Sequence, residues 1–243
     1  MLAAALLVCL LAAPRPAIAQ TQDDLLRQVD AIAGTKGLPV DPLRNKVREG
    51  FAKGRDPRQI EAAVNQIAAN LETADRIVRD VEPGVAPAAR ESAVTLMADA
   101  LLGGLTADEI RGLQRETKVT PLSPQDLAGA AKGLSLIKEA RLPVNDGTAV
   151  MAEALRQKFR SYEMQDLGRE IKRRETDYRA GRVTLQGLRD AIARGTRPET
   201  LLRDSRAVAA ERPAATRPAT PERPERPSAP VERPERPVDR PQR

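Results

Sequence analysis

The sequence of 243 residues contains no histidine and no tryptophan, and it has only one cysteine, two tyrosines and two phenylalanines. Without histidine, neither a Ser-His-Asp nor a Cys-His catalytic arrangement can form, and no metal can be bound through imidazole. Cys9 lies in an apolar segment that we expect to be removed, which excludes thiolate chemistry and disulfides from the mature chain. We therefore expect no cofactor and no metal site.

Pairs of carboxylates are the remaining route to catalysis by side chains, as in glycoside hydrolysis. The candidate pairs are Asp108 with Glu109 and Glu139 with Asp146. Adjacent side chains on a helix point apart, and acidic residues in a first helical turn are explained by the helix dipole. Sugar-binding clefts also usually present aromatic platforms, which this chain almost lacks. The sequence therefore favours a protein that is not an enzyme.

The chain begins with an apolar run that ends in a small-x-small motif, Ala17-Ile18-Ala19. The run is too short to span a bilayer and has the pattern of a secretory signal, although it begins without Lys or Arg. We expect residues 1–19 to be a signal peptide cleaved after Ala19. The mature protein would then be periplasmic or extracellular, with no integral membrane span. The formal net charge of +6 is weak for a nucleic-acid-binding protein, so we expect no nucleic acid partner.

Residues 38–81 predict two helices joined by a tight turn. Gly54 supplies a left-handed stop, and Asp56 and Pro57 provide an N-cap and a first-turn proline for the second helix. The link is too short for anything but an antiparallel helical hairpin. The part of the second helix beyond Leu71 extends past the first, so we expect it to contact a later helix, a second chain or a client. The apolar seam of the second helix is Ile60, Val64, Ile67, Leu71, Ala74, Val78 and Val81.

The Leu-Pro-Val of residues 38–40 recurs at 142–144, and a looser copy of the hairpin begins near Pro87. We therefore predict an all-α fold over residues 20–208, an array of antiparallel helical hairpins with about three degenerate αα repeats. Three local features are also expected. Gly34 would end the first helix, Ser161 would act as an N-cap, and one helix would span residues 162–180.

Residues 209–243 have almost no large apolar side chains and many prolines, and the sequence Glu-Arg-Pro-Glu-Arg-Pro occurs at both 222–227 and 232–237. Such a segment cannot bury enough apolar surface to fold, so we predict a disordered tail. With three residues per turn, a polyproline II helix would place proline, glutamate and arginine on three separate faces. The tail could be a spacer, a proline-rich peptide ligand, a cell-wall tether or a dispensable solubilising segment.

The densest basic cluster lies near three of the four aromatic residues and forms our candidate interaction surface. One interpretation is a docking surface for an anionic envelope component or an acidic partner protein. The favoured interpretation is a solvated helix face with local ion pairs, such as Glu170 with Arg174. The residues of this candidate surface are Arg169, Lys172, Arg173, Arg174, Phe159, Tyr162 and Tyr178.

The motif at residues 38–54, Leu-Pro-Val-Asp-Pro-Leu followed by Lys46, Glu49-Gly50 and Ala52-Lys53-Gly54, resembles exported helical-repeat proteins of proteobacteria. That resemblance implies an all-α exported protein and carries no activity. Residues 105–109, Leu-Thr-Ala-Asp-Glu, also resemble the Leu-Thr-x-x-Gln repeats of Spy/CpxP-like periplasmic chaperones, with Glu in place of Gln.

The sequence therefore predicts a non-enzymatic exported protein that acts through contacts with a protein or an envelope component, with the tail as a polyproline-like spacer. A Spy/CpxP-like chaperone or stress protein, which would hold unfolded clients on an amphipathic surface, is the first alternative. An envelope tether, in which the tail binds a wall polymer, is the second.

Overall fold

A computed structural model describes residues 21–118, 121–196 and 200–201, so the expected signal peptide and proline-rich tail lie outside the described residues. The predicted all-α class is confirmed, because every regular element in these ranges is a helix. The helices are α1 (Gln22–Lys36), α2 (Asp41–Ala52), α3 (Pro57–Val81), α4 (Pro87–Leu102), α5 (Ala107–Thr117), α6 (Pro124–Glu139), α7 (Val144–Arg156), α8 (Ser161–Arg173), α9 (Glu175–Arg179) and α10 (Leu185–Ala193).

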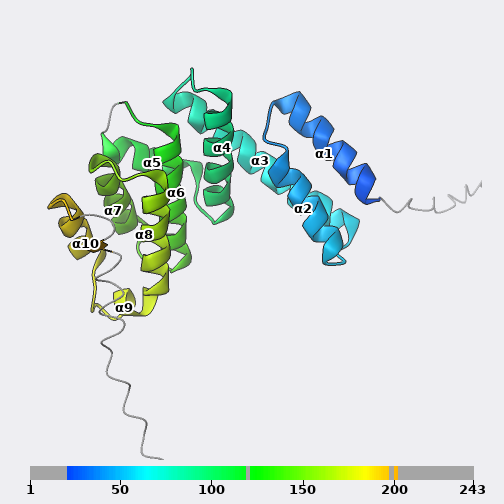
Figure 1. The fold of residues 1–243 in the computed structure, drawn as a ribbon. Helices are drawn as coiled ribbons and strands as arrows, with labels where there is room; N and C mark the ends of the chain where they lie inside the picture. The colour runs from blue at the N-terminus through cyan, green and yellow to red at the C-terminus, as the bar shows by residue number, and fades with distance from the viewer. Residues whose placement is uncertain (1–20, 119–120, 197–199, 202–243) are drawn as a thin grey trace, which may run out of the picture.

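The helices form an arm and a stack (Figure 1). In the arm, α1 and α2 pack against each other and against α3. The stack has two layers, one that continues from α3 through α4 and α6 to α8, and one that contains α5, α7 and α10. Helix α6 also packs extensively against α7, so it joins the two layers. The arm and the stack are therefore connected mainly through α3.

Side-chain caps fix the starts of several helices, including the predicted cap at Asp56. Thr21 and Thr106 form capping boxes with Asp24 and Glu109, in which each side chain accepts a hydrogen bond from the other residue's backbone N–H. The carboxylate of Asp56 accepts a hydrogen bond from a backbone N–H in the first turn of α3. These caps satisfy amides that have no partner within the helix.

Helix ends share one left-handed turn, in which a backbone N–H bonds the carbonyl oxygen five residues earlier, as in the Schellman motif. Gly37, Gly54 and Gly104 take the positive φ that this turn requires, but Arg141 (φ 55°) and Lys158 (φ 59°) take it elsewhere. The turn thus recurs where the sequence offers no glycine. In four of these turns the next residue is apolar and buried, namely Leu38, Leu105, Leu142 and Phe159.

Two expected helix boundaries are wrong. Helix α1 continues past Gly34 to Lys36, because Gly37 is the residue that adopts the left-handed conformation. The helix expected over residues 162–180 is divided at Arg174, which leaves the helical conformation (φ −100°, ψ 20°) and pairs with an aspartate of α9.

Ser161 is not an N-cap, because it is the first residue of α8 and Arg160 precedes it as the cap. The backbone N–H of Ser161 donates to the carboxylate of Asp126 near the start of α6, at 3.2 Å. Burial raises the pKa of Asp126, and the hydrogen bonds that it accepts from Ser161 and Ser123 oppose that effect. The start of α8 is therefore held by a hydrogen bond to Asp126 of α6, and not by the side chain of Ser161 as the sequence predicted.

The expected hairpin is confirmed for α2 and α3, which are adjacent in sequence and packed together. The other two expected hairpins differ, because α4 has no extensive contact with α5 and α7 has none with α8. Helices α4 and α5 pack instead against the helix two positions further along, α6 and α7, whereas α7 also packs against α10 and α8 packs back against α6. The end of α3 beyond Leu71 contacts a later helix, α4, which was one of the three options.

An ion pair supports the junction of α3 and α4. Asp75 of α3 is only 7% exposed, and its Oδ1 accepts a hydrogen bond of 2.7 Å from Nε of Arg90 on α4. Arg79 lies 2.9 Å from the other oxygen of the same carboxylate. Asp75 therefore adds a buried polar contact beside the apolar seam of α3 and links this helix to α4.

Helices α6 and α8 approach so closely that only glycine fits between them. A Cβ atom on Gly168 would lie 2.6 Å from the Cα of Gly133, and one on Gly133 would lie 2.5 Å from the carbonyl oxygen of Met164. Gly129, one turn before Gly133, faces the backbone of Ser161 in the same way, at 2.5 Å. The two backbones therefore touch along about two turns of helix.

We predict that Gly168→Ala lowers the free energy of unfolding by about 2 kcal/mol, because the new methyl group would push two rigid backbones apart. The measurement is urea denaturation followed by circular dichroism. Gly112→Ala is the matched control. Its Cβ would meet nothing closer than 3.9 Å, so we expect a gain of roughly 0.5 kcal/mol from the same substitution. Equal effects at the two positions would contradict the close contact.

Helices α5 and α6 are joined by an ion pair between Glu109 and Lys138. The ammonium group donates to both carboxylate oxygens at 2.8 Å, and both side chains are less than a third exposed. Partial burial raises the pKa of Glu109, but the hydrogen bonds from Lys138 and Thr106 and the charge of Lys138 outweigh it, so the pKa lies below its ordinary value of 4.5. A lowered carboxylate pKa stabilises the fold above that ordinary value, and this stabilisation is lost as the pH falls through the lowered pKa.

We predict that Glu109→Gln costs about 1 kcal/mol of unfolding free energy at neutral pH. The difference from the unaltered chain should shrink when urea denaturation is repeated below the ordinary carboxylate pKa. Asp108→Asn is the neighbouring control, since the Asp108 side chain is 93% exposed and should matter little at either pH. A Glu109→Gln effect that is the same at both pH values would rule out the ion pair as its cause.

Candidate interaction site

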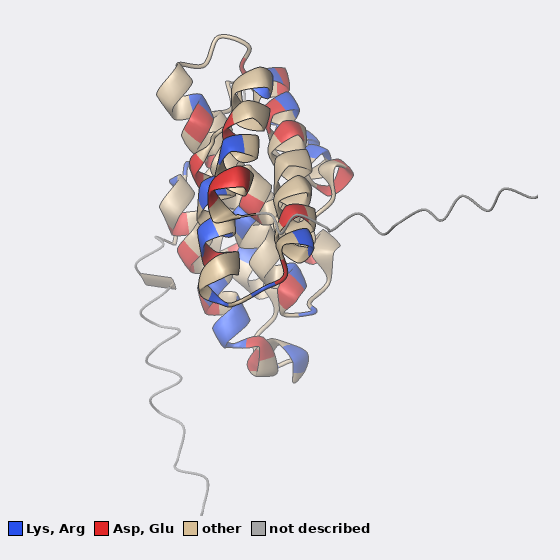
Figure 2. Cartoon of the chain, turned by 90° about the vertical axis from the view of Figure 1, so that its right-hand side faces the viewer, with Lys and Arg blue, Asp and Glu red and all other residues tan. Residues whose placement is uncertain are grey.

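The cations of the candidate interaction surface lie on α8 or at its end, and each is paired with an acid. Two of the four pairs are within α8, one reaches α6 and one reaches α9. Positive charge is therefore compensated locally, and in Figure 2 basic and acidic residues are interspersed over the helices. The pairs are Arg169–Asp166, Lys172–Glu139, Arg173–Glu170 and Arg174–Asp177, at 2.5 to 3.3 Å.

The three aromatic residues of that surface differ in exposure. Phe159 is buried, because it follows the left-handed turn after α7 and packs in the core. Tyr178 is partly buried against the same core, and only Tyr162, at 55%, is well exposed. The interaction surface stays a prediction, with paired cations and one exposed aromatic ring.

A second candidate is a groove between α2 and α4. This depression of about 730 Å³ has walls from both helices and one residue from the start of α6. Because α2 and α4 have no extensive contact with each other, the groove separates them while both pack on α3. We call it the α2–α4 groove and define it by Asp41, Asn45, Glu91, Thr95, Asp99 and Gln125.

The α2–α4 groove continues into a more apolar depression of about 220 Å³, because Asn45, Thr95 and Asp99 line both. Ile67 of α3 and Leu102 of α4 lie in this second part. Leu102 is 57% exposed and is, with Tyr162, one of two large apolar residues exposed in the described part of the chain. The combined groove therefore offers an apolar end and a polar end.

The polar end carries three acids without an ion-pair partner, and the nearest lining cation, Lys46 of the adjoining depression, is paired with Glu49. No described cation forms an ion pair with Asp41, Glu91 or Asp99, and no Lys or Arg lines that end. Arg44, which feels the charge of Asp41, donates its hydrogen bonds to an aspartate of α1 instead. Sequence reasoning missed this site, because its acids come from separate helices with no shared motif.

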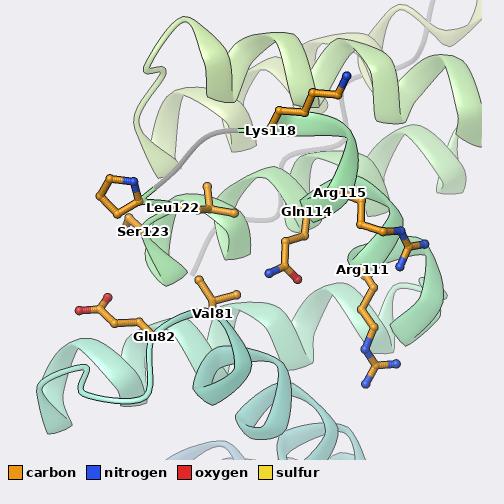
Figure 3. A pocket seen from close by; sticks show the side chains of 9 residues that line it. Val81, Glu82, Arg111, Gln114, Arg115, Lys118, Leu122 and Ser123 are labelled. Atoms are coloured by element: carbon orange, nitrogen blue, oxygen red, sulfur yellow. The ribbon is translucent and has the colours of Figure 1, made fainter.

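A third depression, of about 810 Å³, lies between the end of α3 and α5. Figure 3 shows Val81 and Gln114 near its centre, with the side chains of Arg111, Arg115 and Lys118 extending outward. Neither Arg115 nor Lys118 has an ion-pair partner among the described residues, so this depression has a basic rim.

The carboxylates considered for catalysis either form ion pairs with lysines or lie apart from one another. Glu109 is bound by Lys138, and Glu139 is paired with Lys172. Asp108 is almost fully exposed and does not share a cleft with Glu109. Within the described ranges, no group of three or more acidic residues is placed to hold a metal ion.

None of the helices that the structure describes combines the length and apolar character needed to cross a membrane. Comparisons of the chain with known protein families, with curated proteins and with solved structures give no match.

Burial raises the pKa of Tyr178 to about 12, although the charge of Arg174 opposes this effect. We predict that one step in the ultraviolet titration of tyrosinate falls near that pH and disappears in Tyr178→Phe. Stability that the neutral phenol contributes should be lost as the pH rises through the same value. Tyr162→Phe serves as the control and should leave the step in place. A Tyr178 that titrates at its ordinary value would show that this ring is accessible.

Proposed function

We propose that this chain is an exported, non-enzymatic helical protein that binds another protein through the α2–α4 groove. The observation that carries the proposal is the combination of an apolar end with three acids that have no ion-pair partner. Sixteen ion pairs form among the described residues, and other exposed acids such as Asp80 and Asp146 are also unpaired, so the position of the three acids beside exposed apolar surface distinguishes the groove. Uncompensated charge beside exposed apolar surface is the arrangement that a complementary partner can use.

The proposal also includes export through the signal peptide and a spacer role for the tail. A signal peptide over residues 1–19 would deliver the helical domain to the periplasm or beyond. Residues 209–243 would form a polyproline-like spacer. About three degenerate repeats remain our interpretation of the helical domain, and the left-handed turns at Gly54, Gly104 and Lys158, which follow the first helix of each expected hairpin, support it.

The chaperone alternative has less support from the surface. A protein that holds unfolded clients needs broad apolar surface, because its clients share no sequence. In the described part of the chain, Leu102 and Tyr162 are the only large apolar residues that are well exposed. A partner-specific contact at the α2–α4 groove accounts better for so small an apolar area.

The test is capture of partners from envelope extracts by the purified chain and by a variant with Glu91→Gln and Asp99→Asn. We expect at least one protein to be captured by the unaltered chain and lost with the variant. Asp23→Asn with Asp108→Asn removes the same charge from exposed sites outside the groove and should retain it. A partner that is captured equally by both variants, or none at all, would contradict the proposal.

A further inference from the structure

The polar end of the α2–α4 groove favours a ligand that presents cationic hydrogen-bond donors on one face. Besides its unpaired acids, it contains the Oε1 oxygen of Gln125, which is buried and accepts no hydrogen bond. A buried acceptor without a donor costs free energy that a ligand donor can recover. A guanidinium group provides five N–H donors in one plane and binds carboxylates in pairs.

The apolar end requires a ligand that also has apolar surface with little conformational freedom. Ile67 and Leu102 lie there beside Asn45 and Asn70, whose side-chain amides can both donate and accept hydrogen bonds. Prolines supply rigid apolar surface and leave their own carbonyl oxygens free to accept. An extended segment that alternates arginine and proline therefore fits both ends of the groove.

Residues 221–237 contain recurring Glu-Arg-Pro triplets with four arginines and four glutamates, so the segment has no net charge and can present cations only on its arginine face. In a polyproline II helix, residues three positions apart share a face and are separated by about 9 Å. Arg223 and Arg226 would then lie on one face, while the glutamates that precede them face elsewhere. On α4, Glu91 and Asp99 are eight residues apart, which corresponds to about 12 Å along the helix. The flexible arginine side chains can bridge that difference.

We propose that residues 221–237 of this chain bind in the α2–α4 groove of the same molecule, with Arg223 and Arg226 beside Glu91 and Asp99. The proposal rests on the proposed function, because it takes the groove to be the binding surface. It adds the chemical class of the ligand, an extended segment with arginine at every third position and proline between. The tail is then a built-in competitor for a partner of the same class.

The number of residues after the described part of the chain sets the reach of the tail. The last described residue is Leu201, so 42 residues follow it to Arg243. At about 3.1 Å per residue, the 25 residues from Leu201 to Arg226 can span roughly 78 Å. Helix α3, the longest in the array at 25 residues, is about 37 Å long. The segment therefore has about twice the length of that helix available to reach the groove.

The test is paramagnetic broadening in the full-length mature chain, free of Cys9, with a spin label attached at Ser228→Cys. We expect broadening of backbone amide signals at Asn45, Thr95 and Asp99. It should weaken as salt is raised, because the contact is electrostatic and partly exposed. Addition of a synthetic peptide of residues 221–237 should remove it, and a peptide of the same composition in scrambled order should need roughly tenfold more.

Charge variants make the result specific to the groove. Glu91→Gln with Asp99→Asn should abolish the broadening, and the control variant Asp23→Asn with Asp108→Asn should keep it. Broadening that survives in the groove variant overturns the proposal. So does broadening that appears only between an isotope-labelled copy and a separate spin-labelled copy, or a complete absence of broadening at low salt.

The outcome also separates this inference from the proposed function. If the tail binds the groove but no other protein is captured through it, the inference holds and the proposed function fails. If a partner is captured through the groove and the spin label never broadens α2 or α4, the function holds and the inference fails. If both hold, replacement of Arg223 and Arg226 by glutamine should increase partner capture.

Discussion

The backbone contact between α6 and α8 is the constraint on which the stack depends. Helix α6 packs against α4, α5, α7 and α8, and it can do so only because small residues let its neighbours approach. Gly129 and Gly133 of α6 leave room for the backbone of α8, whereas Gly147 of α7 leaves room for Leu134 and Ile137 of α6. A chain with two tyrosines and two phenylalanines cannot fill wide spaces between helices. Because the helix backbones approach closely, a core with few aromatic side chains can still be well packed.

The helices themselves are largely predictable from the sequence, because their signals are local. The N-cap predicted at Asp56 is confirmed, and Thr21 and Thr106 also cap helices as their side-chain types indicate. The arrangement of helices is less predictable, because which apolar stripe meets which is decided across the chain. Ser161 shows the difference. Its residue type indicated an N-cap, but it is the contact with α6 that fixes its position.

The candidate site was harder to predict for an electrostatic reason. A dense run of like charges such as Arg169 to Arg174 is conspicuous in a sequence, yet the fold brings an acid to each of its four cations. Asp41, Glu91 and Asp99 are inconspicuous in the sequence, yet no described cation pairs with them. Pairing is a property of the folded surface, since Lys172 finds its partner more than thirty residues away at Glu139. Charge density along a chain is therefore a poor guide to free charge on its surface.

The position of the α2–α4 groove gives a ligand there a role beyond occupancy. Its walls belong to the arm and to the stack, which are connected through α3, and Asp75 and Arg90 link that helix to α4. A ligand that contacts Asp41 on α2 and Asp99 on α4 at once binds only when the two helices are at the observed separation. By linkage, whatever binds this way must stabilise that separation by the free energy of its own contacts. Binding of a ligand in the groove and restriction of the arm's movement relative to the stack are therefore coupled.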